Sequence, residues 1–488
     1  MSAAAERLSL IGGAWVGAAG QDWYEVRNPA DSREVVARVP AMAGPDIARA
    51  LDAARDGARR WRSTSIVERG EVLRRAAALV RERSNDIAHE VTLEMGKLIG
   101  EARGEVNKAA DFLEYYAGFG RRPLGEVLPD ARAGAEARAI REPRGVVVAI
   151  TPWNDPVITP ARKLCPALIA GNAVILKPAP ESPLSALHLA RALHDAGLPA
   201  GVLNVIVGPD DEVARGLVRS DGFQALTFTG STEVGLTLQR DLAGRNVILQ
   251  TEMGGKNAAL VLADADPNVV LEALASGGYV QAGQRCTATS RVLVEASRYE
   301  EVLERFAARA GEIRVGPGLS ESAQMGPLVA ESSLDRALAA LEDARAGGAE
   351  VLAGGRRLRE GGLEHGWFMG PTVFGERQPQ SRIWQDELFA PVVGVTPVDD
   401  LEEAIEIVNS SAYGLSAAIF TRDLEAAHRF ADAVDVGCVS VNLPTAGWDV
   451  QMPFGGFKQS GSGFKEQGEN ALDFYSRVKT IAMRVRGI

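Results

Sequence analysis

Short apolar runs alternate with longer amphipathic stretches along the first half of the chain. The runs predicted as strands are Val146–Ile150, Ala173–Leu176, Leu203–Val207 and Ala225–Thr229, with helices expected near Pro160–Ala170 and Leu184–Ala196. Strands separated by helices pair in parallel, so the pattern predicts an α/β fold with a doubly wound sheet. Ligands of such sheets bind at the carboxyl ends of the strands, and a nucleotide site is expected there.

A second alternation follows Gly255. Its predicted strands are Ala258–Leu262, Arg291–Glu295, Val392–Val398, Ala417–Thr421 and Cys438–Asn442. We therefore expect a second α/β domain.

A helical pattern extends from Pro45 to about Phe119. Pro45 suits a first helical turn, and Ser65–Glu68 matches a capping box. This helical layer is expected to cover one face of the sheet. Arg121–Arg144 then breaks the pattern with prolines and glycines, which predicts an extended hairpin or, alternatively, a bare surface loop.

The composition narrows the class of protein. A chain of 488 residues is too long for one core, and 46% hydrophobic with 24% charged residues is typical of a globular protein. The net charge of −11 argues against a nucleic-acid partner, and no apolar run approaches the length of a membrane span. The start of the chain shows no signal-peptide pattern, so we expect a cytoplasmic protein.

Cysteine usage fits a reducing compartment. Cys165, Cys286 and Cys438 are an odd number and widely spaced, which indicates neither a disulfide framework nor a Cys-x-x-Cys metal site. No metal centre is predicted.

One cysteine has the surroundings of a reactive thiol. Gly277–Arg291 is predicted as a loop-like stretch, in which Gly283 frees the backbone and polar residues flank Cys286. The adjacent Arg285 is expected to favour the thiolate, whereas a cysteine in a packed interior, the alternative, would stay neutral.

Two more side chains could act with this thiol. Glu252 follows the apolar run Val247–Leu249 and precedes two glycines, so partial burial is expected to raise its pKa towards neutrality, as general-base work requires. Asn154 follows the first predicted strand and offers an amide that could donate to an oxyanion.

Five stretches together resemble the aldehyde dehydrogenase superfamily, in the right order and over nearly the whole chain. They are Thr151–Asn154, Gln250–Asn257, Gly277–Arg291, Glu387–Pro391 and Pro453–Gly456. The resemblance implies a doubly wound parallel-sheet cofactor domain (1–118 and 139–254), an α/β catalytic domain (255–464) and a small β oligomerisation domain (119–138 and 465–488). It also implies a homodimer or homotetramer, in which the terminal run Val478–Val485 pairs with the 121–144 excursion across subunits.

The resemblance implies oxidation of an aldehyde to a carboxylic acid with NAD or NADP. Cys286 would attack the aldehyde, while Asn154 and the Cys286 backbone N–H would bind the oxyanion. Loss of hydride would leave a thioester, and Glu252 would activate the water that hydrolyses it.

The same resemblance implies the cofactor residues. Lys177 is expected to hold the adenosine ribose, Ser231 a pyrophosphate oxygen and Glu387 the nicotinamide ribose, with Phe389 near the ring. Ala390 replaces the family's usual glycine and leaves the roles of Glu387 and Phe389 in place. The full set is Thr151, Pro152, Trp153, Lys177, Pro180, Gly230, Ser231, Gly235, Glu387 and Phe389.

Pro180 bears on cofactor choice. NAD-preferring relatives often have a glutamate at this position, whose carboxylate binds the ribose hydroxyls and repels a 2′-phosphate. Proline does neither, so the cofactor preference is expected to lean towards NADP or to be relaxed, although the neighbouring Glu181 could take over part of the role.

The aldehyde is expected to be a small acidic semialdehyde. Arg162 matches the carboxylate-binding arginine of succinic semialdehyde dehydrogenases, Arg285 adjoins the nucleophile, and several stretches most resemble 2,5-dioxopentanoate dehydrogenases. Asp155 stands where the family commonly has an aromatic residue, and it could repel an anion or pair with Arg162. Trp448 could equally shape a pocket for an aromatic or other uncharged aldehyde.

Other functions account for fewer of these residues. A dehydrogenase that transfers the acyl group to coenzyme A would not need the base Glu252. A cysteine hydrolase needs a histidine partner, and none of the five histidines lies in a motif. A structural protein on this fold would not be expected to keep nucleophile, base and oxyanion donor together.

Overall fold

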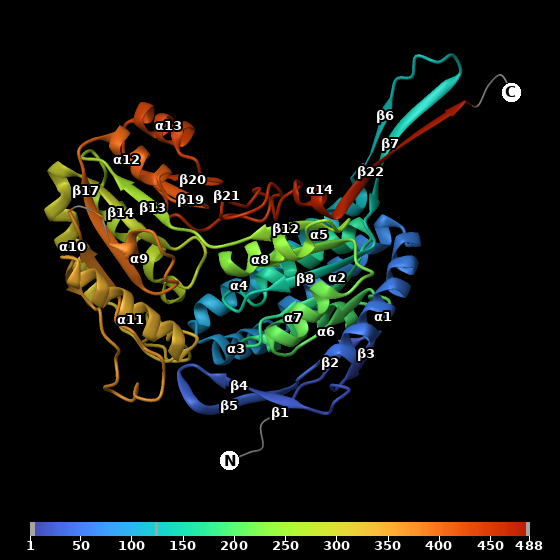
Figure 1. Cartoon of the computed structure of the whole chain (residues 1–488), viewed down its shortest axis with the longest axis horizontal. Helices are drawn as coiled ribbons and strands as arrows, with labels where there is room; N and C mark the ends of the chain where they lie inside the picture. The colour runs from blue at the N-terminus through green and yellow to red at the C-terminus, as the bar shows by residue number, and fades with distance from the viewer. Residues whose placement is uncertain (1–4, 123–124, 378, 380, 485–488) are drawn as a thin grey trace.

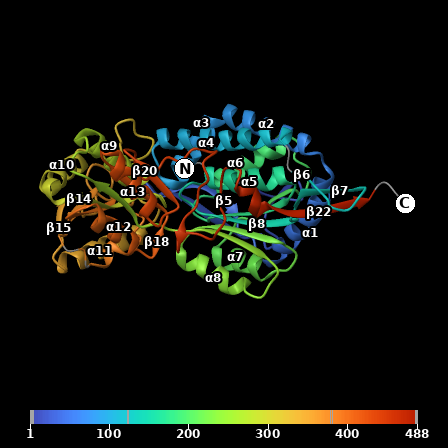
Figure 2. The ribbon, with the colours of Figure 1, turned by 90° about the horizontal axis from the view of Figure 1, so that it is seen from above.

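The computed structural model describes residues 5–122, 125–377, 379 and 381–484. Two lobes lie side by side, and a narrow arm projects from one of them (Figures 1 and 2). Parts of three predictions lie outside the described residues. They are the first four residues considered for a signal peptide, residues 123–124 of the predicted hairpin, and Val485 at the end of the terminal run.

The first lobe contains a five-stranded sheet of order β10-β9-β8-β11-β12, in which every neighbouring pair is parallel. Because the chain moves from β8 to one side and then returns to the other, the order reverses between β8 and β11. All four predicted strands are confirmed, and a fifth contains the apolar run before Glu252. The strands are β8 (Val146–Thr151), β9 (Ala173–Pro178), β10 (Leu203–Val205), β11 (Ala225–Thr229) and β12 (Ile248–Glu252).

Helices cover both faces of this sheet, which confirms the doubly wound prediction. Val147 and Val174 belong to one core, whereas Val148 and Ile175 belong to the core on the other face, as the two-residue period of a strand requires. The first core packs on α2 (Ile66–Glu82), α4 (Ile99–Ala117), α5 (Ile158–Ala170) and α6 (Pro183–Asp195). The second packs on α1 (Gly44–Ser63), α7 (Asp210–Arg219) and α8 (Thr232–Leu242).

The predicted helical layer is also confirmed. Pro45 lies in the first turn of α1, and the capping box before α2 forms, with the Glu68 N–H donating to Ser65 Oγ at 3.2 Å. The layer includes α3 (Ser84–Met95) and is preceded by strands that were not predicted. These are β1 (Ala5–Glu6), β2 (Ser9–Ile11), β3 (Ala14–Val16), β4 (Trp23–Asn28) and β5 (Asp31–Pro40).

The second lobe is built on a seven-stranded sheet of order β15-β16-β17-β14-β13-β19-β20. Its five predicted strands are confirmed, whereas the two at one edge, β15 and β16, were not predicted. The strands are β13 (Asn257–Val261), β14 (Thr289–Glu295), β15 (Glu350–Ala353), β16 (Thr372–Gly375), β17 (Val392–Val398), β19 (Ser416–Phe420) and β20 (Cys438–Val441). Its helices are α9 (Pro267–Tyr279), α10 (Tyr299–Gly311), α11 (Glu331–Ala346), α12 (Leu401–Asn409) and α13 (Leu424–Ala433).

The predicted hairpin forms the arm at the upper right of Figure 1. It consists of β6 (Gly125–Leu128) and β7 (Ala135–Pro143), and β22 (Ser476–Arg484) completes a three-stranded sheet. The expected pairing of the terminal run across subunits is corrected, because β22 pairs with β7 of its own chain, from Ser476 opposite Pro143 to Arg484 opposite Ala135. The short helix α14 (Ala471–Tyr475) leads directly into β22 at the base of the hairpin. There, Arg141 donates a hydrogen bond of 2.7 Å to Asp473.

The remaining short elements are β18 (Tyr413–Gly414), β21 (Phe457–Lys458) and four single turns of 3-10 helix, η1 (Gly118–Arg121), η2 (Val280–Gly283), η3 (Ala296–Arg298) and η4 (Arg382–Trp384). In the part of the chain that the structure describes, no helix has both the length and the apolar character needed to cross a bilayer. The three domains and their boundaries stay a prediction, and the predicted boundary at residues 138–139 falls inside β7.

Candidate active site

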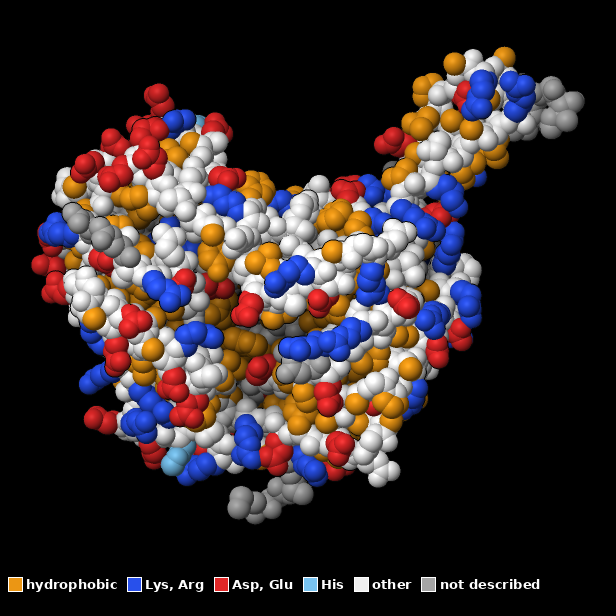
Figure 3. Space-filling model, in the orientation of Figure 1, with side chains coloured by type: hydrophobic (Ala, Val, Ile, Leu, Met, Phe, Trp, Pro, Cys, Tyr) orange, Lys and Arg blue, Asp and Glu red, His pale blue; other side chains and the backbone are white. Residues whose placement is uncertain are grey.

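A cavity of about 390 Å³ lies between the two lobes, where the surface in Figure 3 is hollowed. Its walls come from the carboxyl ends of β8, β11 and β12 on one side and from loops of the second sheet on the other. The cavity therefore lies at the carboxyl ends of the strands, where the sequence predicts a nucleotide site, and next to the point between β8 and β11 at which the strand order reverses. The lining residues are Pro152, Trp153, Asn154, Asp155, Thr159, Arg162, Thr229, Gly230, Ser231, Glu252, Met253, Gly254, Cys286, Ser333, Arg336, Glu387, Phe389, Phe454 and Glu466.

Cys286 lies in a tight loop between η2 and β14. The loop is shorter than predicted, because residues 277–279 belong to α9 and Thr289 already begins β14. Gln281 and Ala282 have left-handed backbone conformations (φ of 56° and 55°), and Gly283 follows at 68°. A side chain at Gly283 would overlap the carbonyl of Ala390, so glycine is required there as predicted.

The thiol of Cys286 is more buried than its sequence neighbours suggested. It packs against an apolar cluster of Leu415, Cys438 and Phe454. Burial, and secondly the charge of Asp155, raise the pKa of Cys286 to about 12, although the cations Arg162 and Arg285 oppose the shift. Arg285 favours the thiolate in the direction expected, but loss of hydration outweighs its charge, so the pKa of the thiol is raised and not lowered.

Asn154 and Cys286 line the same cavity although they come from different sheets. Asn154 lies in the turn between β8 and α5, is 5% exposed, and donates from Nδ2 to the backbone carbonyl of Gln284 at 3.0 Å. This bond uses one of the two Nδ2 hydrogens. The other is available to a ligand oxygen, which is the arrangement that an oxyanion donor requires.

Glu252 is the last residue of β12 and is 2% exposed. Neither carboxylate oxygen has a hydrogen-bond partner among the described residues. Burial, and secondly the charge of Glu466, raise the pKa of Glu252 well above its usual value, in the direction predicted. Gly455, from the Pro453–Gly456 stretch, packs directly against this carboxylate, and a side chain there would collide with it.

A buried ionic cluster beside Glu252 was not predicted. Glu466 forms ion pairs with Lys163 and, at 3.1 Å, with Arg162, and it accepts a hydrogen bond of 2.8 Å from Thr229. Lys163 and Glu466 are fully buried. The pairing of these two residues could not be predicted from the sequence, because Lys163 resembles an ordinary helix residue and Glu466 lies 303 positions away.

Arg162 lies on α5, in the wall of the cavity, rather than on a solvated helix face. Its guanidinium binds Glu466 through Nη1 and stacks over the ring of Phe454 at 4.9 Å, while Nε has no partner among the described residues. The guanidinium fork is therefore only partly used within the protein.

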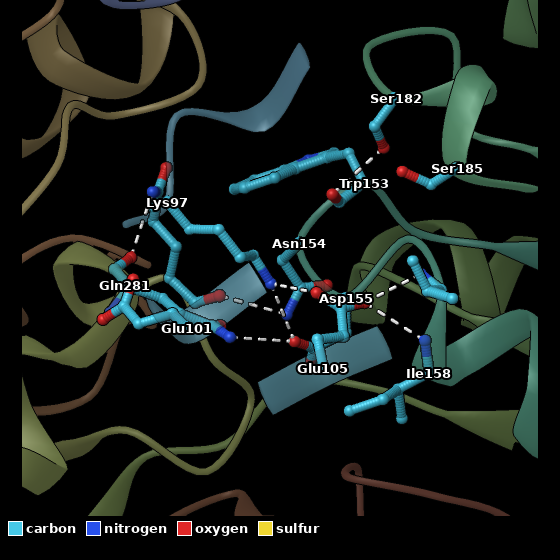
Figure 4. Close-up of polar contacts among 12 residues, drawn as sticks. Lys97, Glu101, Glu105, Trp153, Asn154, Asp155, Ile158, Ser182, Ser185 and Gln281 are labelled. Atoms are coloured by element: carbon cyan, nitrogen blue, oxygen red, sulfur yellow. Dashed lines mark hydrogen bonds and ion pairs between the residues drawn. The ribbon is translucent and has the colours of Figure 1, made fainter. Parts of the chain in front are cut away.

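Asp155 does not pair with Arg162, which corrects one of the two expectations for it. It accepts hydrogen bonds from Lys97 at 3.3 Å and from the Gln281 amide at 3.1 Å. Figure 4 shows these partners around Asp155, with Lys97 also paired with Glu105 and with Asn154 adjacent. Lys97 and its role in this network were not predicted.

The other two candidate substrate residues lie near the cavity but not in its lining. Arg285 lines a smaller adjoining pocket with Lys256 and Glu387. Trp448 packs against the cluster that also contacts Cys286, and its indole N–H is buried with no partner in the described part of the chain.

Six of the predicted cofactor residues line the cavity, namely Pro152, Trp153, Gly230, Ser231, Glu387 and Phe389. Ser231 caps α8, and Trp153 meets Phe389 edge-on with ring centroids 5.5 Å apart. Glu387 accepts a hydrogen bond of 3.0 Å from the Gly255 N–H, and burial raises its pKa to about 7. Thr151, Lys177, Pro180 and Gly235 lie outside the lining.

This part of the site fits a dinucleotide. A short glycine-serine turn leads into the amino terminus of α8, where unpaired N–H groups and the helix dipole favour a phosphate. Gly235 on α8 packs against Met253, and any side chain there would collide with it. Thr151 Oγ1, at the end of β8, is buried without a partner among the described residues. Within the same residues, no group of histidine, cysteine, aspartate or glutamate side chains could hold a metal ion.

Comparison with known proteins agrees with this geometry. A profile described as "Aldehyde dehydrogenase family" matches residues 15–481. An alpha-ketoglutaric semialdehyde dehydrogenase of Bacillus subtilis is 40% identical over 98% of both chains. An alpha-ketoglutarate semialdehyde dehydrogenase of Haloferax volcanii is 41% identical over 97% of this chain and 98% of its own. The crystal structure of a betaine aldehyde dehydrogenase from Staphylococcus aureus in complex with NAD+ superposes with a TM-score of 0.96 at 31% identity, over 99% of this chain and 96% of that chain.

Proposed function

This chain belongs to the aldehyde dehydrogenase family, and on that premise we propose that it oxidises a small acidic semialdehyde through a thioester on Cys286. It is an NAD(P)-dependent oxidoreductase that converts an aldehyde to a carboxylic acid. The observation that carries the proposal is the meeting of Cys286, Asn154, Glu252 and Arg162 in one cavity of about 390 Å³.

The first step is attack of the Cys286 sulfur on the aldehyde carbon. A carbon–sulfur bond forms, and the carbonyl electron pair moves onto oxygen, where the Asn154 amide and the Cys286 backbone N–H donate to it. Because burial raises the pKa of the thiol to about 12, its proton must pass to a water or another base during the attack or just before it, and the sulfur takes up a proton again when the acid leaves. The fixed amide adds to catalysis by stabilising charge that exists only after attack.

When bound, a nicotinamide cofactor supplies the acceptor for the hydride that the adduct loses. The products on the protein are a thioester and an oxygen that has returned to carbonyl form. Glu252 then removes a proton from a water that attacks the thioester, the carbon–sulfur bond breaks, and the acid leaves with the thiol restored. The raised pKa of Glu252 makes it a stronger base than an exposed carboxylate.

The surroundings of Arg162 favour a substrate that carries a carboxylate. The Nε N–H of Arg162 has no partner in the described part of the chain, and its planar fork suits a carboxylate better than any other cation does. The semialdehyde names of the relatives agree with this choice. The alternative is an uncharged or aromatic aldehyde, which Phe454 and Trp448 beside Cys286 favour. Transfer of the acyl group to coenzyme A is the other alternative, and the buried base Glu252 argues against it.

For the cofactor we propose a preference for NADP, or no strong preference. Pro180 follows β9 without the carboxylate that would repel a 2′-phosphate. We propose that Gly230 and Ser231, in the turn before α8, bind the pyrophosphate. Lys177 would bind the adenosine ribose and Glu387 the nicotinamide ribose.

We further propose that the chain forms homodimers or homotetramers through the arm. Val127, Val478 and Met483 are 88%, 65% and 41% exposed there, and apolar strand surface of this kind favours a second copy. Sedimentation equilibrium of the purified protein tests the oligomer. The cytoplasmic location stays a prediction.

A steady-state screen tests the proposed function. Succinic semialdehyde and 2,5-dioxopentanoate are compared with butanal and benzaldehyde, each with NAD and with NADP. We expect a higher kcat/KM for the acidic aldehydes, formation of the carboxylic acid, and a kcat/KM for NADP at least comparable with that for NAD. Equal efficiency for butanal and the semialdehydes would contradict the substrate proposal.

A further inference from the structure

Asp155 puts an acidic side chain in the wall of the substrate cavity. It directly follows Asn154, lines the same cavity as Cys286, and keeps 16% of its side chain exposed. A carboxylate in the wall affects what the cavity recognises, because an ionised oxygen requires hydrogen-bond donors.

One oxygen of Asp155 is held by the protein, and the other is not. Oδ1 accepts from Lys97 Nζ at 3.3 Å and from Gln281 Nε2 at 3.1 Å (Figure 4). None of the described residues donates a hydrogen bond to Oδ2. Since Asp155 lines the cavity, this second oxygen is the part of the carboxylate left for a ligand.

The donors that hold Asp155 are themselves fixed by one helix. Lys97 is buried and paired with Glu105 of α4, whose Oε1 accepts the N–H groups of Val157 (2.7 Å) and Ile158 (3.1 Å) at the start of α5. Glu101, one turn earlier on α4, accepts the Gln281 N–H at 2.9 Å. A solvated surface acid has no such support, so the carboxylate is preorganised at the cavity wall.

Asp155 is ionised in this setting. Although burial raises its pKa, the charges of Lys97 and Arg285 outweigh that effect, so the pKa lies below the usual value. A substrate that presented only methylene groups to Oδ2 would displace the water that solvates this charged oxygen without replacing its hydrogen bonds. A substrate with a donor at this point would satisfy it.

The donor best suited to the place is a hydroxyl group. A second carboxylate would be repelled by Asp155. An ammonium group would meet the positive charges of Arg162 and Arg285, both of which act on Cys286. Asp155 directly follows the oxyanion donor Asn154 and lines the same cavity as Cys286, which places its carboxylate on the side of the cavity where the aldehyde carbon reacts.

We propose that the preferred substrate carries a hydroxyl group on the carbon next to the aldehyde, and that Asp155 binds this hydroxyl while Arg162 binds the acid. Asp155 is then a specificity residue. The inference rests on the proposed function for its acidic group, and on Asp155 alone for the hydroxyl.

Four aldehydes of equal chain length separate the preference for the hydroxyl group from the preference for the carboxylate. They are butanal, 2-hydroxybutanal, 4-oxobutanoate and 3-hydroxy-4-oxobutanoate, with kcat/KM expressed per free, unhydrated aldehyde. We expect each hydroxylated compound to exceed its partner by about 10- to 100-fold, the size of a hydrogen bond to a charged group. A hydroxyl preference at or below unity in the wild type overturns the inference, whereas absence of a carboxylate preference with the hydroxyl preference intact overturns only the proposed acidic substrate.

The variant Asp155→Asn replaces the free oxygen by a donor at nearly constant volume. We expect both hydroxyl preferences to fall by at least about tenfold while the preference of 4-oxobutanoate over butanal persists. The matched control Asp111→Asn removes a surface acid of α4 that pairs with Arg81, and it should leave all ratios unchanged. An unchanged hydroxyl preference in Asp155→Asn overturns the inference. The wild-type comparison decides the question if the variant does not fold.

Discussion

The side-chain amide of Asn154 donates a hydrogen bond of 3.0 Å to the backbone carbonyl of Gln284. This bond joins the turn after β8 to the loop that carries Cys286, so the oxyanion donor and the nucleophile are fixed relative to each other. The second amide hydrogen is left for the oxygen that becomes charged when the thiol attacks.

Replacing Asn154 with Ala should therefore lower kcat by about 10²- to 10³-fold, the usual cost of one oxyanion donor. The KM for the cofactor should change little, because the amide acts on the aldehyde oxygen. Steady-state kinetics with the preferred aldehyde measures both values.

Asn409→Ala is the matched control for Asn154→Ala. Its amide donates to the Ala433 carbonyl at 2.9 Å and accepts from the Asp435 N–H at 2.7 Å, and it does not line the cavity. We expect the control to retain wild-type kcat. A loss in Asn154→Ala no greater than in the control would show that the amide does not act on the oxyanion.

Glu252→Gln should separate the two halves of the reaction. Attack and hydride loss do not need the base, whereas hydrolysis of the thioester does. Rapid mixing should give a burst of reduced cofactor of about one equivalent per site, followed by turnover slowed by about 10²-fold or more. A variant without a burst, or one with wild-type steady-state rate, would remove Glu252 from the hydrolytic step.

The pH dependence of thioester hydrolysis follows from the surroundings of Glu252. Only the ionised carboxylate accepts a proton, and burial with Glu466 nearby raises its pKa. The hydrolysis rate should therefore increase with pH, by about tenfold per unit below that raised pKa, and level off above it. A rate independent of pH between about 6 and 9 would mean that the carboxyl group does not titrate in this step.

Arg162→Leu tests the acidic end of the substrate. Loss of the guanidinium should lower the preference for 4-oxobutanoate over butanal by about 10- to 100-fold, or about 1.5 to 3 kcal/mol. Arg336→Leu is the matched control, since Arg336 also lines the cavity and carries the same charge. The ratio of the two kcat/KM values is the readout, and equal losses in both variants would point to long-range charge rather than to a specific contact.

The left-handed backbone conformation of the loop before Cys286 should limit which substitutions the loop tolerates without loss of stability. Gly283→Ala should destabilise the protein by about 1 to 3 kcal/mol, because φ is +68° and the new methyl group would overlap the Ala390 carbonyl. Gly104→Ala lies within α4 with nothing near its added carbon, and it should be neutral or stabilise by up to about 1 kcal/mol. Thermal unfolding followed by circular dichroism compares the two. A higher melting temperature for Gly283→Ala than for Gly104→Ala would refute the strain argument.

The sequence predicted the residues whose chemistry is visible locally. Glu252 follows an apolar run and precedes paired glycines, and Asn154 follows a strand, so parallel pairing predicts that both lie at the carboxyl ends of the strands. The strands β15 and β16 at the far edge of the second sheet were not predicted.

Long-range partners were beyond local patterns. The pKa of Cys286 depends on burial against Leu415 and Phe454, which are distant in sequence, and one adjacent arginine could not reveal it. Asp155 was expected either to repel an anion or to pair with Arg162, and the pairing is wrong because Lys97 of the helical layer holds the carboxylate. Charged groups in a low-dielectric interior are fixed by the whole fold rather than by their sequence neighbours.

The account depends above all on Cys286 as the nucleophile. The most direct test is the steady-state formation of reduced cofactor by Cys286→Ala, compared with Cys438→Ala, which removes a thiol from the same apolar cluster. We predict that Cys286→Ala loses at least about 10³-fold in kcat, whereas Cys438→Ala keeps activity within about tenfold of wild type. Retention of most of the rate in Cys286→Ala would contradict a mechanism through a thioester on this residue.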